Sequence, residues 1–300
     1  MSESALSFGI KTTPANVSYH DILRVWLDAD AIPEIEHAWL YDHLLPRVGA
    51  GSEPIYEAWT LLSALAARTQ RLRIGVLANN NRIRHPAVLA KIAANIDGIS
   101  NGRLDFGIGV GGLPTSDPRF ATMVAPEYEA FGIPVGEWGA AVASLSEACT
   151  IIRRLWSGEE FDFAGERYRL VGARCNPTPV QSRVPILIAG TGSSTLRIVA
   201  EHADVWNAIG PPLNTAAKLL ERSRVLDGYC AASGRDPRSI TRSVQVAISY
   251  DDPALARVIV RELIDVGFTH VVLNLPSPYP NDVARWVADE LIRPNLERRG

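Results

Sequence analysis

Residues 60–112 read TLLSALAARTQRLRIGVLANNNRIRHPAVLAKIAANIDGISNGRLDFGIGVGG, a stretch in which short apolar runs alternate with longer segments of helical character. The apolar runs 71–77 and 103–110 have the length of buried strands, and polar or glycine-rich residues follow each of them. Between them, 86–100 opens on Pro86, a residue favoured at the first position of a helix. A strand, a helix and a second strand in this order are typical of a βα repeat with a parallel sheet.

The same alternation extends along the chain. Six further segments have strand character, with helical stretches between them: 5–10, 37–41, 185–190, 203–209, 239–248 and 269–275. Eight strands alternating with about eight helices predict a (β/α)8 TIM barrel, formed as one domain over residues 1–300. An open, doubly wound sheet of eight strands is the alternative.

Two segments interrupt the repeat. Residues 113–136 predict a long inserted loop after strand four, and 161–185 contains a hairpin-like insertion, FDF-AGE-RYRL. Long connections in compact domains are usually functional. The first insertion follows the carboxyl end of a strand, where barrel enzymes keep their active sites, and is therefore a candidate lid.

The composition is that of an ordinary soluble enzyme: 47% hydrophobic and 21% charged residues, with a net charge of −3. Because 30 Lys and Arg are spread among 33 Asp and Glu, nucleic acid is not an expected partner. No apolar run approaches the ~18 residues of a membrane span, and the start lacks the pattern of an export signal. The three separated cysteines predict no disulfide framework. We expect a reduced, cytoplasmic protein.

Two titratable side chains, Asp42 and His43, stand at the end of the apolar segment 37–41. Polar residues at the carboxyl end of a barrel strand are typically catalytic or binding residues. An imidazole beside a carboxylate can be held in one tautomer, which suits proton transfer to or from a substrate. The alternative is that Asp42 caps a turn and His43 is an ordinary polar residue.

Two glycine-rich segments are candidates for binding a ligand. GIGVGG (107–112) lets the backbone approach a ligand closely, but it leads into helix-breaking LPTSDP and does not fit a dinucleotide-binding fingerprint. In AGTGSSTLR (189–197), a strand leads into a helix that we expect to begin at Thr195 or just before it. Glycines and hydroxyls at a helix N-terminus predict a phosphate cradle, with capping by Ser193 or Ser194 as the alternative.

Polar residues also end the first and third strands. Asn79, Asn80, Asn81 and Arg82 cannot all be buried without partners, so some should face a ligand or water. Lys11 is a candidate for a Schiff base, against the commoner alternative of a solvated tip. The six histidines lack HxH and HExxH spacing, and no GxSxG occurs, so we expect neither a metal site nor a serine hydrolase.

The segments WLYDHLLP (39–46), 60–112, the hairpin with its following NPTPVQ, and PILIAGTGSSTLRIVAEHADVWN (185–207) resemble the bacterial luciferase-like oxidoreductase family. Within it they are most similar to the branch that depends on coenzyme F420, a deazaflavin. The resemblance runs from about residue 6 to 210. It implies a (β/α)8 barrel that holds a flavin-type cofactor, and the strand count agrees with that fold.

The resemblance assigns roles to single residues. It places Asp42 and His43 beside the reactive ring. It places at Val76 and Leu77 a non-proline cis peptide that backs the ring. Ala78 and Asn79, which follow, are also expected to bind the cofactor. It implies cofactor contacts at Gly109, Val110 and Gly111 and a cofactor phosphate at Gly190, Thr191, Gly192 and Ser193. Substrate contacts are expected from Lys11, Arg47 and Asn81.

Two departures bear on the substrate. Deazaflavin-dependent sugar-phosphate dehydrogenases of the family have a tryptophan where this chain has Arg47 and a catalytic glutamate where it has Gly112. Sugar-phosphate oxidation is therefore not expected. The leading hypothesis is hydride transfer between coenzyme F420 and a small organic substrate, such as reduction of an activated C=C or C=N bond, with His43, oriented by Asp42, moving the proton.

Two alternatives stay open. One is an FMN-dependent monooxygenase that uses reduced flavin and oxygen; the other is a non-catalytic protein that binds a flavin or deazaflavin. As partners we expect an F420-reducing enzyme or a flavin reductase that supplies the cofactor. Apolar residues on more than one face of 57–68 and 86–99 also suggest a homodimer.

Overall fold

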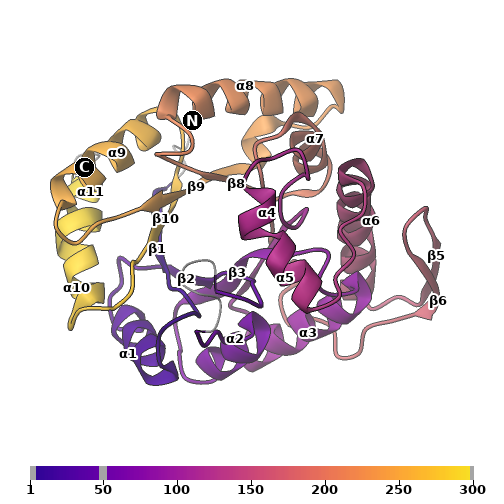
Figure 1. The fold of residues 1–300 in the computed structure, drawn as a ribbon, viewed down its shortest axis with the longest axis horizontal. Helices are drawn as coiled ribbons and strands as arrows, with labels where there is room; N and C mark the ends of the chain where they lie inside the picture. Colours follow the sequence, from indigo (N-terminus) through magenta and orange to yellow (C-terminus); the bar gives the residue numbers. More distant parts are fainter. Residues whose placement is uncertain (1–4, 47–52, 298–300) are drawn as a thin grey trace.

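The computed structural model describes residues 5–46 and 53–297. Its eight parallel strands close into a barrel in the order β1-β10-β9-β8-β7-β4-β3-β2, and helices surround this ring (Figure 1). The closed ring confirms the (β/α)8 barrel and excludes the open doubly wound sheet.

All eight expected strands are present. They are β1 (Ser7–Lys11), β2 (His37–Leu40), β3 (Arg73–Asn80), β4 (Leu104–Gly109), β7 (Ile186–Ala189), β8 (Val205–Ile209), β9 (Thr241–Ala247) and β10 (His270–Asn274). The surrounding helices are α1 (Tyr19–Asp30), α2 (Ala58–Ala66), α3 (Pro86–Ile99), α6 (Trp138–Trp156), α7 (Ser193–His202), α8 (Ala216–Ala232) and α9 (Pro253–Asp265). The chain then forms α10 (Val283–Val287), a π-helical turn (Ala288–Ile292) and α11 (Arg293–Leu296).

The two insertions differ in structure. The hairpin is confirmed: β5 (Phe161–Ala164) pairs antiparallel with β6 (Arg169–Ala173) and projects beyond α3 and α6 (Figure 1). The segment 113–136 is not a continuous loop, because it contains the short helices α4 (Phe120–Met123) and α5 (Ala125–Ala130). In 5–46 and 53–297, no helix combines the length and the apolar character that crossing a membrane needs.

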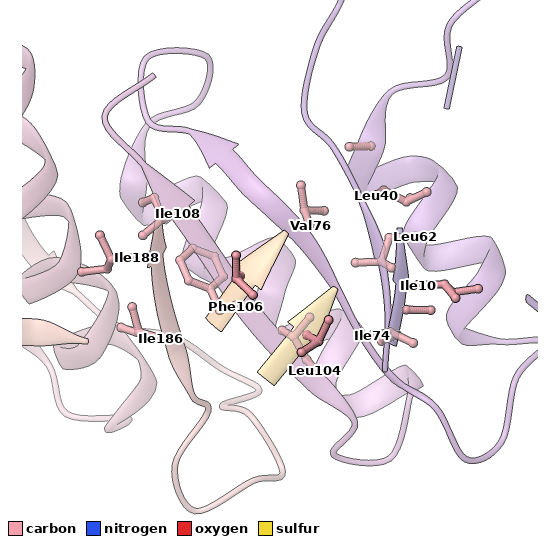
Figure 2. Packing of buried hydrophobic residues seen from close by; sticks show 14 of the residues in the cluster. Ile10, Leu40, Leu62, Ile74, Val76, Leu104, Phe106, Ile108, Ile186 and Ile188 are labelled. Carbon is pink, nitrogen blue, oxygen red and sulfur yellow. The ribbon is translucent and has the colours of Figure 1, made fainter. Parts of the chain in front are cut away.

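Successive strand residues alternate between the helix layer outside the barrel and the barrel interior. One set points outward to the helices and forms the main core, for example Val76, Phe106 and Ile108 (Figure 2). The other set points into the barrel, where a small separate cluster contains Trp39, Leu77, Leu187 and Val272. This period of two follows from the pleat of a β-strand.

A line of hydrogen bonds runs through the barrel interior. Lys11 Nζ donates to Gln245 Oε1, Gln245 Nε2 donates to Asn207 Oδ1 at 2.7 Å, and Asn207 Nδ2 donates to Ser243 Oγ at 2.8 Å. The Ser243 hydroxyl lies 2.8 Å from His270 Nδ1. Because an ammonium group can only donate, Lys11 fixes which group donates and which accepts at each step of this line. Ser243, which accepts from Asn207, therefore donates to His270 Nδ1, and the proton of the neutral His270 ring is on Nε2.

Two histidines close the amino end of the barrel. His37 stacks on His270, with ring centroids 3.9 Å apart, and Trp39 Nε1 donates to His37 Nδ1 at 2.7 Å. Both rings line a cavity of about 360 Å³. Burial lowers the pKa of His270 to about 4 and places the pKa of His37 well below its usual value, so both are neutral at pH 7. Only glycine fits at position 9, where a Cβ would lie 1.9 Å from His37 Nδ1.

Candidate active site

The strand register gathers the predicted site segments at one edge of the barrel mouth. Asn80 of β3 pairs with Gly109 of β4, and Gly109 pairs with Ala189 of β7, directly before the loop that begins at Gly190. From the end of β2, Asp42 Oδ2 accepts the backbone N–H of Asn80 at 3.0 Å. The structure therefore brings together 42–43, 76–81, 109–111 and 190–193 at the carboxyl ends of adjacent strands.

The third strand carries a bulge, and its cis peptide lies one bond beyond the predicted Val76–Leu77 bond. The peptide bond between Leu77 and Ala78 is cis, directly after the Val76–Leu77 pair, and the register with β4 shifts between Val76 and Asn79. The Asn79 side chain accepts from Trp59 Nε1 and donates to the Gly107 carbonyl oxygen. Its amide is thus used within the barrel wall, where it holds the bulge in place.

Asp42 is the partner of an arginine. Arg84 donates to both of its carboxylate oxygens, at 2.8 and 3.0 Å, and also to Glu57. The Asp42 side chain is fully buried. A buried carboxylate with these partners ties the end of β2 to the loop after β3.

His43 has a different partner, and this corrects the expectation that Asp42 orients it. His43 Nδ1 lies 3.0 Å from Glu127 Oε2, on α5 of the first insertion. Consecutive side chains of an extended segment point to opposite sides, so neighbours in sequence need not share a contact. Glu127 Oε1 also accepts the backbone N–H of Leu44.

The Glu127 carboxylate is buried and charged. Burial alone would raise the pKa of Glu127, but the hydrogen bond and electrostatic attraction of the His43 ring, with the backbone N–H groups of Leu44 and Leu45, outweigh burial and lower the pKa below its usual value. An ionised carboxylate can only accept, so His43 Nδ1 carries a proton. Nε2 is then the ring nitrogen that can exchange a proton with a bound molecule.

The glycines after β4 are required by close packing. Gly111 has φ +92°, and a Cβ there would lie 2.0 Å from Asn80 Oδ1. Gly112 has φ +66°, and a Cβ there would lie 2.8 Å from Val124 Cγ1. The insertion therefore occupies the space that a side chain at position 112 would need.

The insertion is docked on the third-strand loop. Asn80 Nδ2 donates to Tyr128 Oη at 3.0 Å, and Arg82 lies over the Tyr128 ring, 5.8 Å from its centroid. Arg82 also donates to the Val135 carbonyl oxygen. Close by, Asn81 Oδ1 is buried without a hydrogen-bond partner among the described residues.

The N-terminus of α7 has the features of an anion site. The helix begins at Ser193, two residues before Thr195, and its N-cap residue is Gly192, which has no side chain to accept a hydrogen bond from the first-turn N–H groups. Arg222 of α8 donates to Ser193 Oγ at 3.0 Å, while its Nε has no partner among the same residues. Free N–H groups, the helix dipole and a guanidinium together suit a phosphate, so these residues fit a phosphate-tailed cofactor.

The other predicted contacts have mixed outcomes. Lys11 lies at the barrel mouth and is tied to Gln245. Arg47 lies outside the described residues. Within the described ranges, no group of three or more His, Cys, Asp or Glu is arranged to hold a metal ion.

Sequence reasoning missed Arg84, Glu127 and Arg222. The buried Asp42 was a signal for the first, because a carboxylate at the end of a buried strand needs a cation. Glu127 and Arg222 meet His43 and Ser193 across 84 and 29 positions of the chain, and no local pattern marks such contacts.

With this fold and site, the chain belongs to a known family. Residues 8–291 match the family described as luciferase-like monooxygenase. Over 203 residues the chain is 30% identical to pyrimidine monooxygenase RutA of Acinetobacter baylyi, covering 67% of this chain and 52% of RutA. It is 33% identical over 231 residues to F420-dependent glucose-6-phosphate dehydrogenase of Nocardia farcinica, covering 74% of this chain and 63% of that protein.

The chain thus spans between half and two thirds of the length of these two relatives. Among solved structures, it is similar in fold to an F420-dependent secondary alcohol dehydrogenase bound to an F420-acetone adduct. That similarity has a TM-score of 0.81 and 16% identity, and it covers 97% of this chain and 99% of the other. The barrel architecture is therefore that of the family.

Proposed function

We propose that the protein is an oxidoreductase that transfers a hydride between coenzyme F420 and a small organic substrate. One observation carries this proposal: the uncapped N-terminus of α7, with Arg222 beside it, is joined through paired strand ends to the bulge at Leu77–Ala78. His43 stands at the end of the next strand along. The relative from Nocardia farcinica, by name F420-dependent, adds support.

Each part of the site has a role in holding such a cofactor. Ser193 and Arg222 would hold its phosphate, and the bulge with Gly109 would support its ring. When bound, the deazaflavin supplies the hydride chemistry. The protein contributes binding, orientation and a group that handles the proton.

His43 is the proposed proton donor or acceptor. Its Nδ1 is engaged by Glu127, which leaves Nε2 to exchange a proton with the substrate. General acid–base catalysis of this kind contributes about 10²–10⁴ in rate. In the reductive direction the proton goes to the atom beside the one that receives the hydride, as in reduction of an activated C=C or C=N bond.

A second candidate is an FMN-dependent monooxygenase. The similarity to pyrimidine monooxygenase RutA favours it, and the same phosphate site suits FMN. Because flavin forms an oxygen adduct readily and deazaflavin does not, the cofactor decides between the two reactions. A separate reductase that supplies the reduced cofactor is part of both proposals.

A side-by-side titration with coenzyme F420 and FMN, each oxidised and reduced, separates the candidates. We expect saturable binding of the deazaflavin with the lower dissociation constant. Tighter binding of FMN, with oxygen-dependent turnover, would transfer the proposal to the monooxygenase. If the protein bound neither coenzyme F420 nor FMN, both candidate functions would be wrong.

A further inference from the structure

We propose that Glu127, carried by the insertion at 113–136, is the positioning residue of His43, so that the insertion completes the acid–base centre. The catalytic consequence rests on the function proposed above. The geometric claim, that a carboxylate from the insertion fixes the state of the histidine, stands on the structure of the chain alone. The insertion is then a working part of the site and not only a cover.

Glu127 is the charged group that touches the His43 ring among the described residues. Its Oε2 lies 3.0 Å from Nδ1, its side chain is 4% exposed, and that of His43 is 19% exposed. The His43 ring also meets the Tyr41 ring in an edge-to-face arrangement, with 5.5 Å between the centroids. The neighbouring Asp42 is occupied by Arg84, which also pairs with Glu57.

The contact between Glu127 and His43 determines which ring nitrogen carries the proton. The carboxylate accepts the Nδ1 proton, which leaves the Nε2 lone pair of a neutral ring free to take a proton from the substrate. In the opposite direction, Nε2–H gives that proton up. Glu127 keeps its negative charge throughout and stabilises the imidazolium, as the aspartate of a serine protease triad does for its histidine.

The position of Glu127 depends on docking of the insertion. Tyr128, the next residue, hydrogen-bonds Asn80, and Val124 packs where position 112 has no side chain. Backbone N–H groups of Leu44 and Leu45 hold the carboxylate from the other side. Movement of α5 away from the barrel would therefore remove the partner of His43. Proton transfer therefore depends on the docked position of α5.

The test is Glu127→Gln in the full chain, with Glu129→Gln as the matched control. Glu129 lies on the same helix, two residues on, and is exposed. Glutamine keeps the shape of the side chain and removes its charge. We expect Glu127→Gln to lower kcat about 10- to 1,000-fold. The dissociation constant of the cofactor should stay within about twofold, and the kcat profile should move to lower pH. Glu129→Gln should match the wild type.

A second readout needs no turnover. In the wild-type chain, ¹⁵N NMR of the His43 ring, assigned with His43→Gln, should show the proton of the neutral form on Nδ1. A proton on Nε2 instead would overturn the proposal. The proposal would also fail if Glu127→Gln had the same kcat and the same pH profile as the Glu129→Gln control. If neither cofactor binds, the proposed function fails, but the NMR result still decides whether Glu127 holds His43.

Discussion

Arg84 donates to both carboxylate oxygens of Asp42, at 2.8 and 3.0 Å, and so joins the end of β2 to the loop that follows the bulged β3. The pair explains why two adjacent titratable residues differ in role: Asp42 is bound to Arg84, and His43 is left for Glu127.

Removing the arginine should destabilise the protein. Arg84→Met leaves the Asp42 carboxylate buried without its cation, which typically costs about 3–5 kcal/mol in the free energy of unfolding. Urea denaturation of the variant and the wild type measures this loss in the free energy of unfolding. The double variant with Asp42→Asn should recover a large part of the loss, because no unpaired charge remains. Equal stability of Arg84→Met and wild type would contradict a structural role for the pair.

The phosphate site can be tested without knowing the substrate. Arg222→Ala should weaken binding of FMN about tenfold or more, since a hydrogen bond to a charged group contributes about 1.5–3 kcal/mol. Riboflavin, which has no phosphate, should bind both forms alike. Arg224→Ala, an exposed arginine of the same helix, is the control. If Arg222→Ala weakened riboflavin binding as much as FMN binding, the phosphate would not be at this site.

The stacked histidines at the barrel base should make stability fall in acid. The pKa of His270 is about 4 in the folded chain against 6.5 in the unfolded chain. The unfolded state therefore takes up its proton first as the pH falls. The contribution of His270 to the free energy of unfolding is fully present above about pH 6.5 and is lost as the pH falls to about 4. At pH 5 the loss from this residue is about 2 kcal/mol.

Unfolding free energies at pH 8 and pH 5 check this expectation. His270→Gln should reduce the difference between the two pH values, although His37 will retain part of it. His20→Gln, at an exposed position of α1, should leave the difference unchanged. A pH dependence that is the same in all three proteins would show that His270 titrates alike in the folded and unfolded chains.

Docking of the insertion should depend on the absence of a side chain at position 112. Gly112→Ala adds a Cβ 2.8 Å from Val124 Cγ1 at a residue with φ +66°, and we expect a loss of about 1–2 kcal/mol. Limited proteolysis should then cut within 113–136 faster than in the wild type. Gly139→Ala, in α6 with no atom within 4 Å of the added Cβ, should not change the cutting rate.

The fold was predictable because short local patterns in the sequence specify its strands and helices. The apolar runs at 71–77 and 103–110, and Pro86 at the start of α3, specify strands and a helix without knowledge of distant residues. The family resemblance, and not a local pattern, predicted a cis peptide at Val76–Leu77, and the structure has it one bond later, at Leu77–Ala78. Propensity alone gives no sign of such a bond.

The site was predictable only where it follows the strand ends. His43, Gly109 and Gly190 lie where the alternation of strands and helices places them. Partners that come from elsewhere, such as Glu127 and Arg222, depend on how an insertion and a neighbouring helix pack. For that reason Asp42, the nearest carboxylate in sequence, was assigned to His43 in place of Glu127.

The most direct measurement is a crystal structure of the full chain with bound coenzyme F420. We expect the phosphate within hydrogen-bonding distance of the Ser193 backbone N–H and the Arg222 guanidinium, and the ring against the Leu77–Ala78 bond with its reactive edge toward His43. A phosphate bound away from α7, or a ring that does not reach His43 at saturating cofactor, would contradict the proposed site.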